Sequence, residues 1–174
     1  MKTILIVDDE PAARYGLRRA LESKYRIAEA DSAEAGREAL LTEKPDLVLL
    51  DVVLPGQDGL SFLKMLRDQG STMPVLMISA LDAAKTAVDA LRLGAADYLV
   101  KGFELDELRQ RVANLLKLSS LEQENVSLRR QLDRHHPQPV KQILAKFSTA
   151  NFCRQIAMCR ADHPHIHRNR LRAA

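Results

Sequence analysis

Polar side chains that could do chemistry follow four of the short aliphatic runs in this sequence. They are Asp8 and Asp9, Asp51, Ser79 and Lys101. Clustered carboxylates repel one another unless a cation neutralises them, and Mg²⁺ does so while keeping coordination sites open for water or phosphate. Lys101 would then stabilise charge on a transferring phosphoryl group, and Ser79 would hydrogen-bond one of its oxygens. Asp51 is the candidate nucleophile, because an aspartyl phosphate needs a carboxylate beside the metal.

These residues can meet only if the aliphatic runs are neighbouring strands. The runs are residues 4–7, 25–30, 47–50, 75–78 and 98–100. Four are nearly continuous Val, Ile and Leu, typical of a parallel sheet covered on both faces, whereas the more mixed second run indicates an edge strand. Helical periodicity lies between them, at residues 12–21, 32–41, 60–68, 83–93 and from 104 onward. The alternation predicts the α/β class, with a doubly wound five-stranded parallel sheet and right-handed crossovers.

The edge formed by the strands' carboxyl ends is where such a sheet binds ligands, close to the switch in strand order. Taken singly, the residues there have ordinary interpretations. Two aspartates after a strand often form a loop or cap, and a lysine after a strand is usually solvated. The combination of all of them at one edge, in order, favours a phosphoacceptor site.

The composition excludes several classes of protein. The chain has 174 residues, 46% of them hydrophobic and 28% charged, which is unlike collagen, mucin or a wholly disordered protein. Its longest uncharged run, residues 69–81, is 13 residues long, short of the roughly 20 needed to span a bilayer. The start, MKTILIVDDE, lacks the apolar region of a signal peptide, so we expect a cytoplasmic protein with no membrane association.

The charge divides the chain. Residues 1–117 hold 16 Lys and Arg against 19 Asp and Glu, and the remaining residues hold 10 against 4. All five histidines lie after residue 134. We therefore expect a first domain at residues 1–117, a helical extension at 118–134 and a basic, His-containing tail at 135–174 that is partly helical or disordered.

The segments ILIVDDE, LVLLDVVLPGQDG, VLMISA and ADYLVKGF, in this order, resemble the receiver domain of two-component response regulators. The resemblance covers about residues 1–117. It implies a flavodoxin-like fold that takes a phosphoryl group from a sensor histidine kinase or a phosphotransfer protein onto Asp51, as in a phosphorelay. Such a domain is a signalling switch, not an enzyme, beyond its own phosphoryl transfer and dephosphorylation.

The resemblance also implies a role for each matching residue. Asp8 and Asp9 correspond to the acidic pair that binds Mg²⁺, and the backbone carbonyl of Val53 corresponds to a further ligand. Ser79 matches the switch hydroxyl, Lys101 the phosphate-binding lysine, and Tyr98 the aromatic whose rotamer reports phosphorylation. Val53 and Leu81 flank the path of an attacking water in this family. Because both are apolar here, we predict a slowly hydrolysing aspartyl phosphate.

The sequence departs from the family at Lys101-Gly102, where a cis Lys-Pro bond is usual. A cis bond before a residue other than proline costs about 3–4 kcal/mol, so we expect a trans bond or a mobile loop. The alternative, which we favour, is that the wide backbone freedom of Gly102 lets the loop bring Lys101 to the same place.

A long helix is expected to leave the domain, because residues 104–133 contain no Gly or Pro. A heptad seam follows from Leu118, Leu121, Asn125, Leu128 and Leu132, with Lys117 and Glu124 opposite Glu122 and Arg129 of a second chain. One Asn in such a seam favours a parallel homodimer. The alternative is a single amphipathic extension that folds back or frays, since little more than two heptads is marginal alone.

The tail leaves several functions open. A receiver with such a linker resembles the start of activators of enhancer-dependent sigma factors, but the phosphate loop of their ATPase domain is absent from these residues. Metal binding by Cys153, Cys159, His163, His165 and His167 is disfavoured by their spacing. Nucleic-acid binding is unlikely without helix-turn-helix patterning. Two rival hypotheses stay open: a transcription regulator whose basic tail contacts DNA, and an interaction module that works without phosphorylation.

Overall fold

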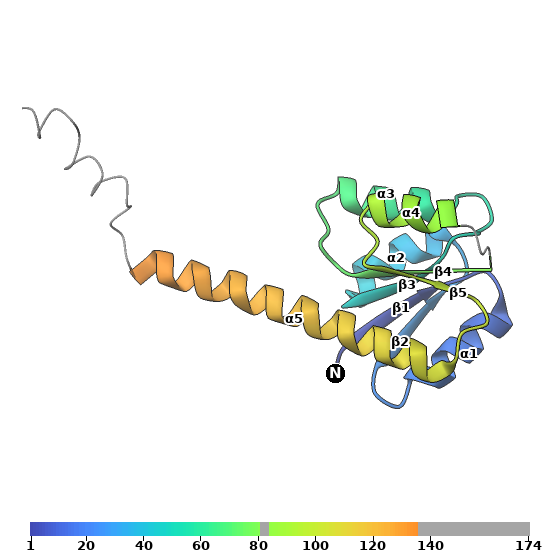
Figure 1. Ribbon diagram of the computed structural model, residues 1–174, viewed down its shortest axis with the longest axis horizontal. Coiled ribbons are helices and arrows are strands. Elements are labelled where there is room, and N and C mark those ends of the chain that lie inside the picture. Colours follow the sequence, from blue (N-terminus) through green and yellow to red (C-terminus); the bar gives the residue numbers. More distant parts are fainter. Residues whose placement is uncertain (81–83, 136–174) are drawn as a thin grey trace, which may run out of the picture. The chain divides into compact units, whose positions relative to one another are not determined.

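The computed structural model describes residues 1–80 and 84–135, with side chains up to residue 131 (Figure 1). The chain separates into two units, Met1–Glu124 and Asn125–Ala174. Residues 118–124, which we assigned to the extension, belong to the first unit. The proposed helix within the tail, and all of its Cys and His ligand candidates, lie outside the described residues.

A five-stranded parallel sheet forms the centre of the first unit. Its strands are β1 (Thr3–Val7), β2 (Arg26–Ala30), β3 (Leu47–Asp51), β4 (Val75–Ser79) and β5 (Asp97–Val100). They lie in the order β2-β1-β3-β4-β5, and every pairing is parallel. The strand order reverses at β1, which pairs with β2 on one side and β3 on the other. The predicted doubly wound, flavodoxin-like α/β fold is confirmed, and the mixed second run is an edge strand.

Five helices accompany the strands. They are α1 (Pro11–Leu21), α2 (Ala33–Glu43), α3 (Gly59–Asp68), α4 (Ala84–Arg92) and α5 (Leu105–His135). Helix α2 begins where expected, because the Ser32 side chain accepts a hydrogen bond from the Ala35 amide and thereby caps the helix. Asp58 caps α3 in the same way. These caps fix where the chain turns from strand edge to helix.

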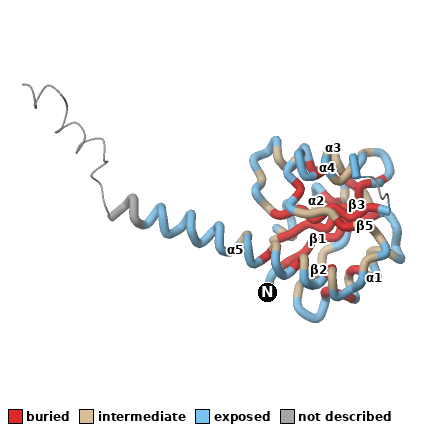
Figure 2. The backbone as a smooth tube through the Cα atoms, viewed as in Figure 1, coloured by how far each residue is buried: buried red, intermediate tan, exposed pale blue. Residues whose placement is uncertain are grey.

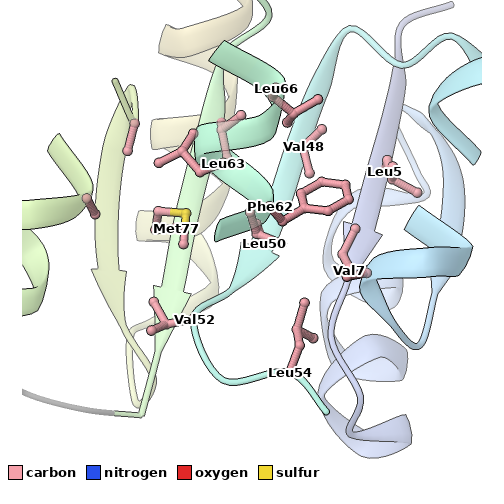
Figure 3. Close-up of a cluster of buried hydrophobic side chains, with 14 of the residues drawn as sticks. Leu5, Val7, Val48, Leu50, Val52, Leu54, Phe62, Leu63, Leu66 and Met77 are labelled. Atoms are coloured by element: carbon pink, nitrogen blue, oxygen red, sulfur yellow. The ribbon is translucent and has the colours of Figure 1, made fainter. Parts of the chain in front are cut away.

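Both faces of the sheet are buried, as the continuous aliphatic runs indicate (Figure 2). On one face, Phe62, Leu63 and Leu66 of α3 pack with residues of α2 and α4 against Leu5, Val7, Val48, Leu50 and Met77 (Figure 3). On the other, α1 and α5 cover alternate side chains of the same strands. A sheet fixed on both faces holds the ends of its strands in a rigid register.

Helix α5 changes character along its length. Its first three turns place Leu108, Val112 and Leu116 in the core against the sheet. Beyond Leu116 it is exposed, apart from the half-buried Ser119, as far as its side chains are described. None of the helices in residues 1–80 and 84–135 combines the length and apolar content needed to cross a bilayer.

Candidate functional site at the carboxyl ends of the strands

The register of the sheet brings the predicted polar residues to one edge. Val7 pairs with Leu50, Asp51 with Ile78, and Ser79 with Val100, so β1, β3, β4 and β5 end side by side. Asp51 and Ser79 are the last residues of β3 and β4, whereas Asp8 and Lys101 follow β1 and β5 directly. We call Asp8, Asp9, Asp51, Ser79 and Lys101 the carboxyl-end site.

The three carboxylates of this site lie close together. Oxygens of Asp8, Asp9 and Asp51 lie within 4.8 Å of one another. Asp8 and Asp51 are only 1% and 4% exposed, whereas Asp9 faces solvent. Buried carboxylates need a positive partner, because burial alone disfavours their charge. The cluster therefore offers oxygen ligands from both the buried and the open side.

Lys101 supplies positive charge from β5. Its Nζ donates a hydrogen bond to Asp51 Oδ2 at 2.6 Å and lies 2.9 Å from Asp8 Oδ2. Burial by itself would lower the pKa of Lys101, but its contacts with Asp51 and Asp8 outweigh this, so the pKa lies above its ordinary value. The amine is therefore held in its charged form between two strand ends.

Asp8 has a raised pKa. Burial raises its pKa, and the negative charge of Asp51 adds to this effect against the opposing influence of Lys101 and the Glu10 amide. The Glu10 amide donates to Asp8 Oδ1 at 2.9 Å. Asp8 Oδ2 is buried, and its charged partner is the Lys101 amine, whose Nζ lies 2.9 Å away without the alignment of a hydrogen bond. A buried carboxylate oxygen with no aligned donor is a suitable ligand for a hard cation.

Two residues near the site were not identified from the sequence. Arg14 of α1 donates to the Asp8 backbone oxygen at 2.8 Å and lies 3.7 Å from Glu29 of β2. A carboxylate oxygen of Glu10 lies 4.0 Å from Lys101 Nζ. Glu10 directly follows the two aspartates in the sequence, and this position was the signal that could have identified it. Nothing in the spacing of Arg14 tells which face of its helix meets the strand end.

The loop after β3 holds Asp51 in place. The Val53 amide donates to Asp51 Oδ1 at 3.0 Å, and Val53 itself is exposed beside the acceptor. The Gly59 amide donates to the Val52 carbonyl at 2.9 Å, and a side chain at Gly59 would overlap the carbonyl oxygen of Asp51. Only glycine therefore permits this close approach of α3 to the end of β3.

Ser79 and Tyr98 lie on the neighbouring strands β4 and β5. Ser79 is fully buried, and its carbonyl accepts a hydrogen bond from the Lys101 amide at 2.7 Å. Tyr98 of β5 is half-buried and packs against the core on the α2, α3 and α4 face. Leu81, the other residue expected along the water path, lies outside the described residues.

The predicted seam residues follow this site in sequence, and those with described side chains are exposed. Leu118, Leu121 and Leu128 are 58%, 46% and 50% exposed, and Asn125 also faces solvent. The side chain of Leu132 lies outside the described set. Leu118 and Leu121 belong to the first unit, Asn125 and Leu128 to the second.

Comparison with known protein families gives a match over most of the first unit. Residues 4–113 match the family model described as the response regulator receiver domain. The chain is 38% identical over 125 residues to response regulator MprA of Mycobacterium ulcerans (strain Agy99), covering 71% of this chain and 54% of that protein. It is 42% identical over 121 residues to the KDP operon transcriptional regulatory protein KdpE of Escherichia coli (strain K12), covering 69% and 53%.

Solved structures give the same result. The receiver domain of the Francisella response regulator 1452 aligns with a TM-score of 0.65 at 31% identity, covering 68% of this chain and 99% of that one. NtrX from Brucella abortus, solved with ADP, aligns with a TM-score of 0.70 at 35% identity, covering 74% and 30%. The chain spans about half the length of the curated relatives it matches.

Proposed function

Because the chain belongs to the response regulator receiver domain family, we propose that it accepts a phosphoryl group on Asp51 and changes conformation as a result. The observation that carries the proposal is the contact of the Lys101 amine with both Asp51 and Asp8, at 2.6 and 2.9 Å. A lysine so placed is suited to bind a phosphoryl oxygen once the group is on Asp51.

The transfer would begin from a phosphohistidine of a sensor histidine kinase or phosphotransfer protein. A carboxylate oxygen of Asp51 attacks the phosphorus, a new P–O bond forms, and the P–N bond breaks with its electron pair going to the imidazole nitrogen, which then takes up a proton. Lys101 would stabilise the negative charge that builds up on the phosphoryl oxygens. Dephosphorylation reverses the state by attack of water, so the domain acts as a switch and carries no enzymatic function beyond this self-directed chemistry.

The site fits Mg²⁺. Its residues offer oxygen ligands in a cluster, one of them the buried Oδ2 of Asp8, which has no aligned hydrogen-bond donor. Asp8, Asp9, Asp51 and the Val53 carbonyl would hold the ion, and the ion would neutralise the carboxylates and the incoming phosphoryl oxygens. Without it, Asp8 and Asp51 would have to share the single charge of Lys101.

The conformational change would start at Ser79. A phosphoryl group on Asp51 is a new acceptor at the end of β3, and Ser79 ends the neighbouring strand β4 directly after Ile78, the register partner of Asp51, so its hydroxyl would donate to that group. Movement of that residue would free space for Tyr98 to turn inward. The phosphoryl group is then the differential ligand that shifts the population between two packings.

The proposal is tested by incubating the full chain with acetyl phosphate and Mg²⁺ and measuring its intact mass. The wild type should gain one phosphoryl group, and the Asp51→Asn variant should gain none. Asp58→Asn is the matched control, because Asp58 is an exposed acid seven positions on, and Asn keeps its role as helix cap. Equal labelling of wild type and Asp51→Asn would refute the assignment.

We further propose that α5 dimerises the chain as a parallel coiled coil. Leu118, Leu121 and Leu128 are about half exposed at heptad spacing, and a second copy of the helix would cover them. Lys117 and Glu124 would lie opposite Glu122 and Arg129 of the partner. Analytical ultracentrifugation with and without acetyl phosphate tests both the dimer and its dependence on phosphorylation.

A second candidate function is DNA binding. It is favoured by the relative named as a transcriptional regulatory protein, which weighs against our expectation that nucleic acid is an unlikely partner. The family model ends at residue 113, so it does not include the basic residues 118–174. This candidate predicts steeply salt-dependent DNA binding that disappears when residues 135–174 are deleted. The other rival hypothesis, an interaction module that works without phosphorylation, predicts that the Asp51→Asn variant binds its partner as the wild type does.

A further inference from the structure

Lys101 and Phe103 are both fixed, and Gly102 lies between them. The Lys101 amide donates to the Ser79 carbonyl at 2.7 Å, which extends the pairing of β4 with β5 by one residue. Phe103, two positions on, packs against the core beneath α1 and α5. The change of direction from strand to helix therefore falls largely on Gly102.

Gly102 makes this turn with a backbone conformation that other residues avoid. Its φ is +108°, and all peptide bonds among the described residues are trans, including the one that joins it to Lys101. A Cβ at this position would meet no atom within 4 Å, so space is available for a side chain. What restricts the residue type is the backbone angle, because L residues other than glycine are strained at this φ.

The consequence falls on the Lys101 amine. The Lys101 side chain extends from the end of β5 to Asp51 and Asp8. A residue that pulled φ at position 102 back to negative values would rotate the chain beside Lys101, while Phe103 and Ser79 hold both ends. The amine would then lose its contact with one or both carboxylates.

We propose that Gly102 is a positioning residue for phosphoryl transfer, whose positive φ aims the Lys101 amine at Asp51 and Asp8. This inference rests on the proposed function, because it concerns the residue that binds the transferring group. It assigns no chemistry to Gly102 itself. Its effect is exerted through Lys101.

The test compares Gly102→Ala with Gly70→Ala in the full chain. Gly70 follows α3 with a φ of +76° and likewise has no atom within 4 Å of a built Cβ, so both variants carry backbone strain without a steric clash. We expect labelling by acetyl phosphate and Mg²⁺ to slow roughly tenfold in Gly102→Ala, the size set by the strain at such a residue. Gly70→Ala should be labelled at the wild-type rate, even though both variants lose thermal stability.

A double-mutant cycle separates positioning from general loosening of the loop. In the Lys101→Ala background, Gly102→Ala should cause no further loss of rate, because the group it aims is already absent. Gly102→Asn should recover part of the rate in the presence of Lys101, because Asn tolerates positive φ better than Ala. Additive losses in the cycle would overturn the inference.

The outcomes distinguish this inference from the proposed function. If the wild type is labelled on Asp51 and Gly102→Ala is labelled equally fast, the positioning role is wrong and the phosphoacceptor function stands. If the wild type takes up no phosphoryl group, the proposed function fails and the positioning role fails with it.

Discussion

The carboxyl-end site and the outer segment of α5, residues 117–131, depart from the usual pattern of burial in opposite directions. In the site, the charged or polar side chains of Asp8, Asp51 and Ser79 are buried. The outer segment is coloured mostly as exposed in Figure 2, and its large apolar side chains at Leu118, Leu121 and Leu128 are about half exposed. Buried polar groups and exposed apolar stripes are the informative exceptions to ordinary folding, since neither is favourable unless something else compensates.

The inner part of α5 shows what an ordinary solution looks like. Leu108, Val112 and Leu116 lie on the same helix as the exposed leucines, yet all three are in the core. The difference between the two halves therefore comes from what the helix has to pack against, since helix formation is common to both. Under the two proposals above, the exceptions would be compensated separately, the buried acids by a cation or phosphoryl group and the exposed leucines by a second chain.

The largest effect is expected from breaking the charge compensation of the site. Lys101→Ala should slow labelling of Asp51 by acetyl phosphate about 10²- to 10³-fold, as the loss of one preorganised donor to a transferring group does elsewhere. Rates followed by intact mass measure this. Lys64→Ala, which removes an exposed lysine from α3, is the matched control and should label at the wild-type rate.

The next effect concerns stability along α5. Leu108→Ala should lower the free energy of unfolding by about 2–5 kcal/mol, because it leaves a cavity in the core. Leu121→Ala removes the same atoms from an exposed position of the same helix and should leave unfolding of the first unit nearly unchanged. Urea denaturation of both variants at low protein concentration compares them, and similar losses would contradict the division of the helix.

Self-association of the chain should depend on the outer segment of α5, not on its inner part. Asn125→Lys would place like charges opposite each other in the seam of a parallel pair and should weaken association at least about tenfold. Sedimentation measured over a range of protein concentrations gives the dissociation constant. Ser127→Lys, at an outward heptad position two residues away, is the control. If both variants self-associate as the wild type does, the seam is wrong.

The lifetime of the phosphorylated state should depend on the exposed residue beside Asp51. Val53→Asn would bring an amide that can orient a water near the acceptor, so we expect a several-fold shorter half-life of the aspartyl phosphate. Loss of the phosphorylated mass after removal of acetyl phosphate measures the half-life. Val53→Leu keeps the position apolar and should leave it long, and an unchanged half-life in Val53→Asn would refute the hypothesis.

The smallest effect is expected at Asp46, a paired carboxylate on the opposite edge of the sheet. Burial would raise its pKa, but hydrogen bonds from Lys2 and the Thr3 amide bring it below the ordinary value of 3.8. Because the folded-state pKa is lowered, the stabilisation is complete above the ordinary value of the unfolded chain and is lost as pH falls from there through the folded-state pKa. Because the side chain is partly exposed, this is worth less than about 1 kcal/mol.

Unfolding of wild type and Asp46→Asn in urea, measured between neutral and strongly acidic pH, tests this expectation. The wild type should be the more stable protein at neutral pH, and the difference should shrink on acidification. A difference that grew as the pH fell would contradict it.

Most of the fold could be predicted from local pattern. The continuous aliphatic runs at β1, β3 and β4 indicated a sheet covered on both faces, and the polar residues at their ends indicated which edge carries chemistry. The absence of Gly and Pro indicated the length of α5. These signals are local, and in an α/β chain the handedness of the crossovers leaves few ways to assemble them.

The support of the site could not be predicted in the same way. Arg14 reaches Asp8 only because α1 crosses the sheet at a particular angle, and no periodicity reports that angle. Gly102 was visible as a departure from the family, but whether Lys101 could still reach Asp51 depended on one backbone angle. Such details follow from tertiary packing, which a single sequence does not reveal.

The central claim is that the transferred phosphoryl group resides on Asp51, and borohydride reduction tests it most directly. Borohydride converts an acyl phosphate of aspartate into homoserine, and tandem mass spectrometry of the digested chain then identifies the modified position. After treatment with acetyl phosphate and Mg²⁺, we predict homoserine at residue 51 and unmodified aspartate at residues 8, 9 and 58. Homoserine at another position, or none in a chain that carries the phosphoryl mass, would contradict the account.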